Sequence, residues 1–129
     1  MKIVTLIARV LLGLMFLVFG LNGFLHFIPQ GPMPATGPAG RFLGALMESH
    51  YFVPIFLLQI VSGALFLVNR YVPLALMLIA PVIVNILLFH SLMNPGGLPP
   101  GLIATALWVV VAYGVRSAFA GILQKNAKI

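Results

Sequence analysis

Four long apolar stretches, joined by short segments rich in proline, glycine or charge, constrain this chain more than any other feature. A helix needs about 20 apolar residues to cross the ~30 Å hydrocarbon core of a bilayer. Four stretches fit this length, at about residues 4–28, 52–69, 72–93 and 101–121. Only 6% of the residues are charged, which is too few to cover the surface of a soluble domain. The sequence therefore predicts an all-α integral membrane protein with one domain over residues 1–129.

The connections between these stretches predict how the helices run. The segment after the first stretch opens with prolines and glycines that cannot be helical. A short helix is predicted next, over about residues 40–50, and it either lies at the membrane interface or enters the membrane partway. The connections at 69–73 and 94–101 are tight, so the helices that they join must be antiparallel. We therefore expect a four-helix bundle in the membrane.

The first stretch also has a feature of secretory signals, because Lys2 precedes its apolar run. It is too long for a signal, it contains Arg9, and it lacks a cleavage site between small residues before its end. We interpret it as a retained transmembrane span.

The basic residues predict the orientation of the chain. With both termini in the cytoplasm, six of the seven Lys and Arg residues lie inside: Lys2, Arg9, Arg70, Arg116, Lys125 and Lys128. Only Arg41 then lies outside, near Glu48, which is the one acidic residue. This distribution follows the positive-inside rule, so we predict cytoplasmic N and C termini.

Missing residue types exclude several classes of function. The chain has no cysteine, which excludes disulfides, thiolate metal ligands and C-x-x-C redox chemistry. It has no glycine-rich phosphate loop and no nucleophile paired with a base, so no catalytic residue is predicted and enzyme activity stays an open question. The spacing of the three histidines specifies no metal site. Topology accounts for the net charge of +6, and nucleic acid is not an expected partner.

Polar uncharged side chains are concentrated toward the extracytoplasmic half of the predicted spans. The amides and imidazoles that support this interpretation are Asn22 and His26 in the outer part of the first span, Gln59 near the middle of the second, and Asn85 and His90 in the outer part of the third. Burying an amide or imidazole without a partner costs about 1–3 kcal/mol, so we expect these groups to face the bundle interior. There they are predicted to line a shared polar cavity. Gly13 and Gly20 share a face of the first span and are expected to allow close helix packing.

Two segments, residues 21–29 and 84–95, carry an Asn, a His and a proline in the same order. Because they are 63 to 64 residues apart and both run outward, one interpretation is a tandem repeat of two hairpins related by an axis along the membrane normal. Asn85 and His90 are about 140° apart on an ideal helix, so they share a face only if Pro81 distorts the span. Alternatively, Asn85 satisfies backbone groups that Pro81 frees.

The histidines allow several interpretations. His26 and His90 are candidates for hydrogen-bonding or proton-donating partners of a quinone, with Asn22, Asn85 and Gln59 orienting them. Axial ligation of haem is a weaker alternative. Simple interhelical hydrogen bonds are another.

A second polar group precedes the second long stretch. Glu48 and His50 are predicted to relay protons between the buried site and the outer aqueous phase. In the competing interpretation, Glu48 pairs with Arg41, two turns earlier on the short helix.

Several segments taken together resemble the DoxX family of small bacterial membrane proteins. They are ARVLLGLMFLVFGLNGFLHFIP, RFLGAL, SHYFVP, NRYVPLALMLIAPVIVNILLFH and AYGVRSAF, and the resemblance covers essentially the whole chain. It implies a four-helix multi-pass protein of the bacterial inner membrane. It also implies an association with redox work, because the family includes membrane subunits of a thiosulfate:quinone oxidoreductase and members placed with oxidant-defence systems. No catalytic motif is carried over.

These observations lead to two hypotheses. The first is an accessory subunit of a redox system, with an extracytoplasmic polar cavity that binds a quinone or a similar small molecule. It requires a membrane or periplasmic redox partner in addition to the lipid bilayer, and a second copy of the chain is a further candidate partner. The second is a non-catalytic membrane scaffold or a small-molecule permease.

Overall fold

All regular structure in the part of the chain that the structure describes is helical. The computed structural model describes residues 2–29, 34 and 36–127. Five α-helices and two 3₁₀ turns follow one another: α1 (Lys2–Leu25), α2 (Gly37–Glu48), α3 (Phe52–Val68), α4 (Val72–Leu92), η1 (Pro95–Gly97), α5 (Leu98–Gly114) and η2 (Arg116–Phe119). The prediction of an all-α fold is confirmed.

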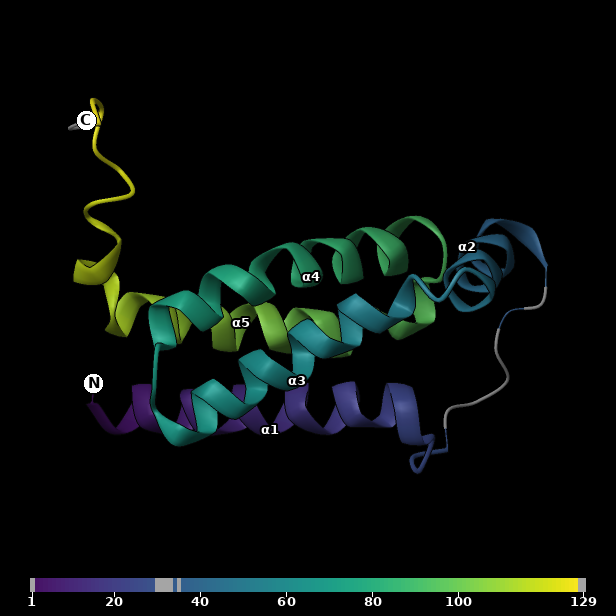
Figure 1. The fold of residues 1–129 in the computed structure, drawn as a ribbon, viewed down its shortest axis with the longest axis horizontal. Coiled ribbons are helices and arrows are strands. Elements are labelled where there is room, and N and C mark those ends of the chain that lie inside the picture. Colours follow the sequence, from purple (N-terminus) through teal and green to yellow (C-terminus); the bar gives the residue numbers. More distant parts are fainter. Residues whose placement is uncertain (1, 30–33, 35, 128–129) are drawn as a thin grey trace.

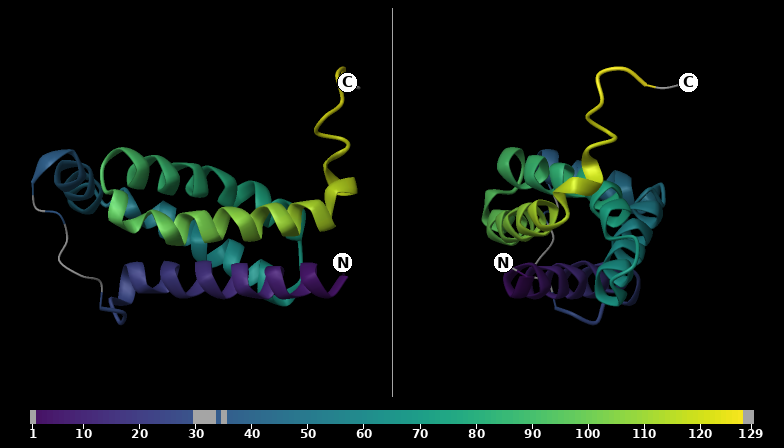
Figure 2. Two further views of the ribbon diagram at one scale, coloured as in Figure 1. Left: turned by 180° about the vertical axis from the view of Figure 1, so that it is seen from behind. Right: turned by 90° about the vertical axis from the view of Figure 1, so that its left-hand side faces the viewer.

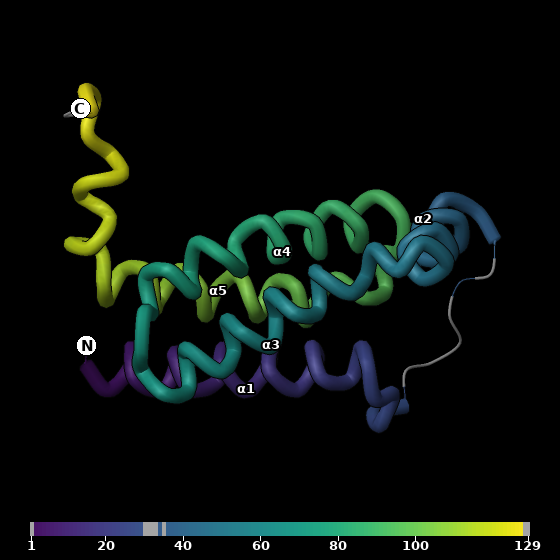
Figure 3. Tube along the Cα trace, in the orientation of Figure 1, coloured from purple at the N-terminus to yellow at the C-terminus, as the bar shows by residue number. Residues whose placement is uncertain are grey.

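The four longest helices lie side by side and alternate in direction. In Figure 1, α1 and α4 run one way and α3 and α5 run the other, so the start of α1 and the end of α5 lie at the same end of the molecule. We call this the terminal end. The Cα trace in Figure 3 shows α2 at the opposite end, which we call the α2 end. Lys128, which the orientation argument counted as cytoplasmic, lies outside the described residues.

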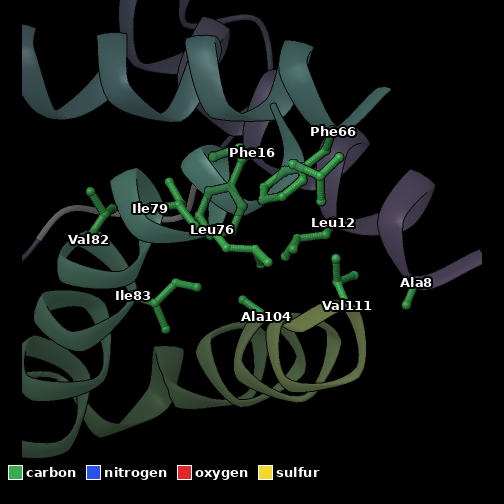
Figure 4. Close-up of a cluster of buried hydrophobic side chains, with 12 residues drawn as sticks. Ala8, Leu12, Phe16, Phe66, Leu76, Ile79, Val82, Ile83, Ala104 and Val111 are labelled. Carbon is green, nitrogen blue, oxygen red and sulfur yellow. The ribbon is translucent and has the colours of Figure 1, made fainter. Parts of the chain in front are cut away.

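The four long helices form a closed ring of contacts. α1 packs mainly against α3, α3 against α4, α4 against α5, and α5 against α1, as the end-on view of Figure 2 illustrates. α1 and α4 are therefore diagonal to each other. The interior is filled by apolar side chains from all four helices, including Leu12, Phe66, Leu76 and Val111, each 0% exposed (Figure 4).

Three described helical segments are long and apolar enough to cross a membrane. They are Lys2–Leu25, Val72–Leu92 and Pro95–Gly114. The fourth predicted span corresponds to α3, which has only 17 residues. It follows α2 at a break where the axis bends by 84°, and the pair qualifies as a fourth span if it is treated as one broken span.

The helix bounds differ from the predicted bounds where proline fits a first turn. α2 was predicted at about 40–50 but begins at Gly37, and α5 was predicted to begin at about 101 but begins at Leu98. Both helices carry proline at one of their first two positions. The missing N–H costs nothing there, because first-turn N–H groups have no partner within the helix.

Glycines bring α1 and α3 close together. A Cβ built on Gly63 would lie 2.5 Å from the backbone nitrogen of Leu17 and 2.8 Å from the backbone oxygen of Gly13. A Cβ on Gly20 would lie 3.0 Å from the Cβ of Gln59. The expectation that Gly13 and Gly20 allow close packing is confirmed, and Gly63 is the facing residue on α3.

Arg9 joins α1 to the C-terminal end of α3. Its guanidinium donates hydrogen bonds to the backbone oxygens of Phe66 and Leu67. These belong to the last turn of α3, where carbonyls lack helical partners and carry the negative end of the helix dipole. The half-buried arginine therefore caps a neighbouring helix.

Candidate functional site

Asn22 and His26 together end α1. The side chain of Asn22 is 4% exposed, and its Oδ1 accepts a hydrogen bond of 2.7 Å from the backbone N–H of Ile28. His26 follows the last helical residue in the left-handed conformation, with φ of 52°, and its N–H donates to the Asn22 carbonyl at 2.9 Å. This is the geometry of a helix C-cap. The imidazole of His26 itself is exposed.

His90 is held by the loop that follows its own helix. Its Nδ1 lies 3.1 Å from the backbone oxygen of Asn94, and a Cβ on Gly97 would collide with its ring. The ring also packs edge-on against Phe89, with centroids 5.0 Å apart. The loop from Asn94 to Gly97 thus holds the imidazole in place. Position 97 requires glycine because the loop passes close to the ring there.

Asn85 satisfies its amide within α4. Its Nδ2 donates to the Pro81 carbonyl at 2.8 Å, and the residue is exposed. The carbonyl that Pro81 leaves without a helical donor is that of Met77, four residues earlier. Asn85 therefore adds a bond to the proline's own carbonyl and does not replace the bond that the proline removes.

The polar residues of α3 lie in the packed interior. Gln59 is 6% exposed and Ser62 is 0% exposed. The Ser62 hydroxyl has no hydrogen-bond partner among the residues that the structure describes. Gln59 faces Gly20 of α1, so this polar face belongs to the contact between α1 and α3.

The candidate proton relay lies at the surface, between α2 and α3. Glu48 is the last residue of α2, and His50 follows in the left-handed conformation, with φ of 62°. Both side chains are exposed, as is Arg41. The two relay candidates lie at the sharp bend at the α2 end, where the ring of His50 lies 6.1 Å from that of Phe52 between centroids.

The prediction that all five polar residues within the spans face the interior is only partly correct. It holds for Asn22 and Gln59, His90 is half-buried, and the prediction is wrong for His26 and Asn85, which are exposed. The physical reason is local. Asn85 finds an acceptor on its own helix, and His26 lies beyond the end of α1. His26 and His90 end helices that are diagonal in the ring, so the structure does not bring the two imidazoles into one chamber.

A cleft of about 240 Å³ does lie at the α2 end. It is lined by Phe42, Asn85, Leu88, Phe89, Leu92 and Met93. The rings of Phe42 and Phe89 are 5.4 Å apart between centroids. Asn85 supplies the only polar side chain among these lining residues. Sequence reasoning missed the two phenylalanines, although Phe89 follows Asn85 by four residues and so shares its helix face.

No metal centre is evident in the described ranges. They contain no group of three or more His, Cys, Asp or Glu side chains placed to hold an ion. Comparisons of the chain with protein-family models, curated proteins and solved structures give no match.

Replacing His26 with glycine tests whether its imidazole or its backbone matters. We expect His26→Gly to raise the free energy of unfolding by about 0.5–1 kcal/mol, because glycine adopts the left-handed conformation without strain. Thermal unfolding in detergent measures this change, with His26→Ala as the matched control that keeps the strain. A loss of stability in His26→Gly would show that the ring makes a contact that the cap geometry does not include.

Proposed function

We propose that this protein is a four-helix subunit of the bacterial inner membrane that binds a quinone or a similar small amphipathic molecule. The observation that supports this proposal is the cleft between α2 and α4, where one amide borders a largely aromatic and aliphatic wall. Small-molecule sites typically combine an apolar lining with a few polar groups. At about 240 Å³ the cleft holds a single ring, and an isoprenoid tail extends along the lipid-facing surface.

The chemistry of Asn85 suits a quinone. A carboxamide has two N–H donors and an acceptor oxygen, and Asn85 uses one donor on the Pro81 carbonyl. The second N–H can donate to a quinone carbonyl, and Oδ1 can accept from a quinol hydroxyl. Phe42 and Phe89 supply aromatic surface on which the ring packs. α2 contacts the other helices only weakly, so Phe42 can shift to admit the ring.

The proposed topology places this cleft on the outer side of the membrane. Lys2 and Arg116 lie at the terminal end of the molecule (Figure 1), and the positive-inside rule puts such residues in the cytoplasm. The α2 end, with Glu48 and the cleft, then faces the periplasm. The resemblance to the DoxX family supplies the association with redox work. The described residues contain no cluster of metal-ligating side chains to serve as a second redox centre, so electron transfer would require a partner subunit. A second copy of the chain is a further candidate for assembly.

Asn85→Leu tests the proposal directly. The wild-type protein is expected to co-purify with quinone, and the variant to retain about threefold to tenfold less, as expected for loss of one neutral hydrogen bond. Mass spectrometry of the extracted lipids gives the ratio of quinone to protein. Ser91→Ala is the matched control, because Ser91 also bonds back to a carbonyl of α4 but does not line the cleft. The proposal is contradicted if Asn85→Leu and Ser91→Ala retain equal amounts of quinone, or if the wild-type protein carries none.

A non-catalytic scaffold is the second candidate function. It is favoured over a permease by the interior of the ring, where a continuous cluster of buried apolar side chains separates the two ends. If the protein is a scaffold, no quinone co-purifies with it, and Asn85→Leu leaves its function in the cell unchanged. The same extraction experiment therefore distinguishes the two functions.

A further inference from the structure

A larger cleft lies at the terminal end, between the start of α1 and the end of α5. Its volume is about 480 Å³, and it is lined by Lys2, Thr5, Tyr113, Gly114 and Arg116. These residues come from opposite ends of the chain, and the contact between α1 and α5 brings them together. Two are cations, and two carry hydroxyl groups.

The Arg116 guanidinium has a fixed position at the rim of this cleft. Its Nη1 donates a hydrogen bond of 2.8 Å to the backbone oxygen of Tyr113. Its central carbon lies 4.2 Å from the centroid of the Tyr113 ring, within the range of a cation–π contact. Since a guanidinium has five N–H donors, several remain free to bind an anion.

Gly114 keeps the floor of the cleft open. A Cβ at this position would lie 2.7 Å from Oγ1 of Thr5 and 2.5 Å from its methyl carbon. The glycine therefore leaves the Thr5 hydroxyl room beside the two cations. The first turn of α1 contains no acidic residue, so the positive end of the α1 dipole adds to the field of Lys2.

Among the described residues, the cations of this cleft have no acidic side chain nearby. Glu48 is the chain's single acidic residue, and it ends α2, at the opposite end of the molecule (Figure 1). A concave site with two cations, a hydroxyl and a helix N-terminus favours a phosphate-like anion. Ile3 and Val4, which lie between Lys2 and Thr5 in the first turn of α1, are exposed apolar residues, so an acyl chain can lie against this part of the helix.

We propose that this cleft binds the phosphate group of an anionic membrane lipid. Arg116 and Lys2 pair with the phosphate charge, and the Thr5 hydroxyl donates to one of its oxygens. The acyl chains lie along the exposed apolar surface at the start of α1. This site is separate from the cleft beside Asn85, and it does not depend on quinone binding.

Native mass spectrometry of the purified full-length protein tests the proposal. Phosphatidylglycerol, phosphatidylcholine and inorganic phosphate are titrated separately. We expect phosphatidylglycerol to bind with defined stoichiometry, phosphatidylcholine to bind more weakly, and inorganic phosphate alone to bind least. Arg116→Gln should weaken phosphatidylglycerol binding about fivefold, the effect of one basic residue near an anionic surface. Thr5→Val, which changes shape little, should weaken it by a smaller factor.

Arg70→Gln is the matched control, because Arg70 is exposed at the same end of the molecule but does not line the cleft. It should leave phosphatidylglycerol binding unchanged, and circular dichroism checks that each variant is folded. Equal weakening by Arg70→Gln and Arg116→Gln overturns the proposal, because it indicates diffuse attraction to the surface. Tighter binding of inorganic phosphate than of phosphatidylglycerol overturns the assignment to a lipid.

Discussion

Gly63→Ala is expected to destabilise the protein by about 3 kcal/mol, near the upper end of the usual cost of overpacking. The added Cβ would lie 2.5 Å from the Leu17 nitrogen and 2.8 Å from the Gly13 oxygen. Both contacts are with backbone atoms, which cannot rotate out of the way as a side chain does. α1 and α3 must therefore separate, and the contacts along the most extensive helix pair are lost together. Unfolding of the purified variant by heat or by denaturing detergent measures the effect.

Gly44→Ala is the matched control for this prediction. Gly44 lies inside α2, and a Cβ there meets nothing within 4 Å. Alanine favours a helix over glycine by up to about 1 kcal/mol, so Gly44→Ala should be neutral or slightly stabilising. If Gly63→Ala and Gly44→Ala are equally stable, the close approach of α1 and α3 at Gly63 does not stabilise the fold.

Much of the fold could be predicted because it depends on hydrophobicity, which the sequence displays directly. The apolar stretches at about 4–28, 72–93 and 101–121 correspond to helical segments long enough to span a membrane, although the last of these segments, Pro95–Gly114, ends at Gly114 and not near residue 121. Gly13 and Gly20 could be placed at a helix contact because they share a face of one helix. The bend of 84° between α2 and α3 could not be predicted, since it depends on backbone angles at Ser49 and His50 that no periodic pattern records.

The candidate site was harder to predict because a polar side chain in a helix has two ways to satisfy its hydrogen bonds. Partners on other helices would bring these side chains into a shared chamber. Asn85 bonds the Pro81 carbonyl on its own helix, and Asn22 bonds the N–H of Ile28 just beyond its own helix. These local partners are four and six residues away, so an inward orientation is not required. The direction in which each of these side chains points could therefore not be predicted from the sequence.

Because local partners differ, the repeated order of Asn, His and proline does not give the two segments the same role. In the first segment Asn22 is buried and caps the C-terminal end of α1, while His26 is in the left-handed conformation. In the second, His90 stays in the helix and contacts the following loop, and Asn85 is exposed. The tandem repeat of hairpins stays a prediction, but the polar residues of its two halves are not used equivalently.

Arg9→Met is expected to lower the free energy of unfolding by about 2–3 kcal/mol, the range for hydrogen bonds to a charged group. The guanidinium donates to the carbonyls of Phe66 and Leu67 at the end of α3, and methionine offers no donor to replace it. The variant also loses a positive charge at the negative end of the α3 dipole. Chemical denaturation in mild detergent gives the size of the change.

Two further variants separate capping by Arg9 from a general effect of charge. Arg9→Lys keeps the charge but not the planar fork of donors, so its stability should fall between those of Arg9→Met and the wild type. Arg70→Met removes an exposed charge one residue beyond the C-cap of α3, and it should leave stability unchanged. If Arg9→Met proved as stable as the wild type, the α3 carbonyls would have to be satisfied by backbone N–H groups alone, such as that of Asn69, which lies 3.4 Å from the Phe66 oxygen. We expect a large loss of stability in Arg9→Met and none in Arg70→Met, because the half-buried Arg9 connects α1 to the C-terminal end of α3.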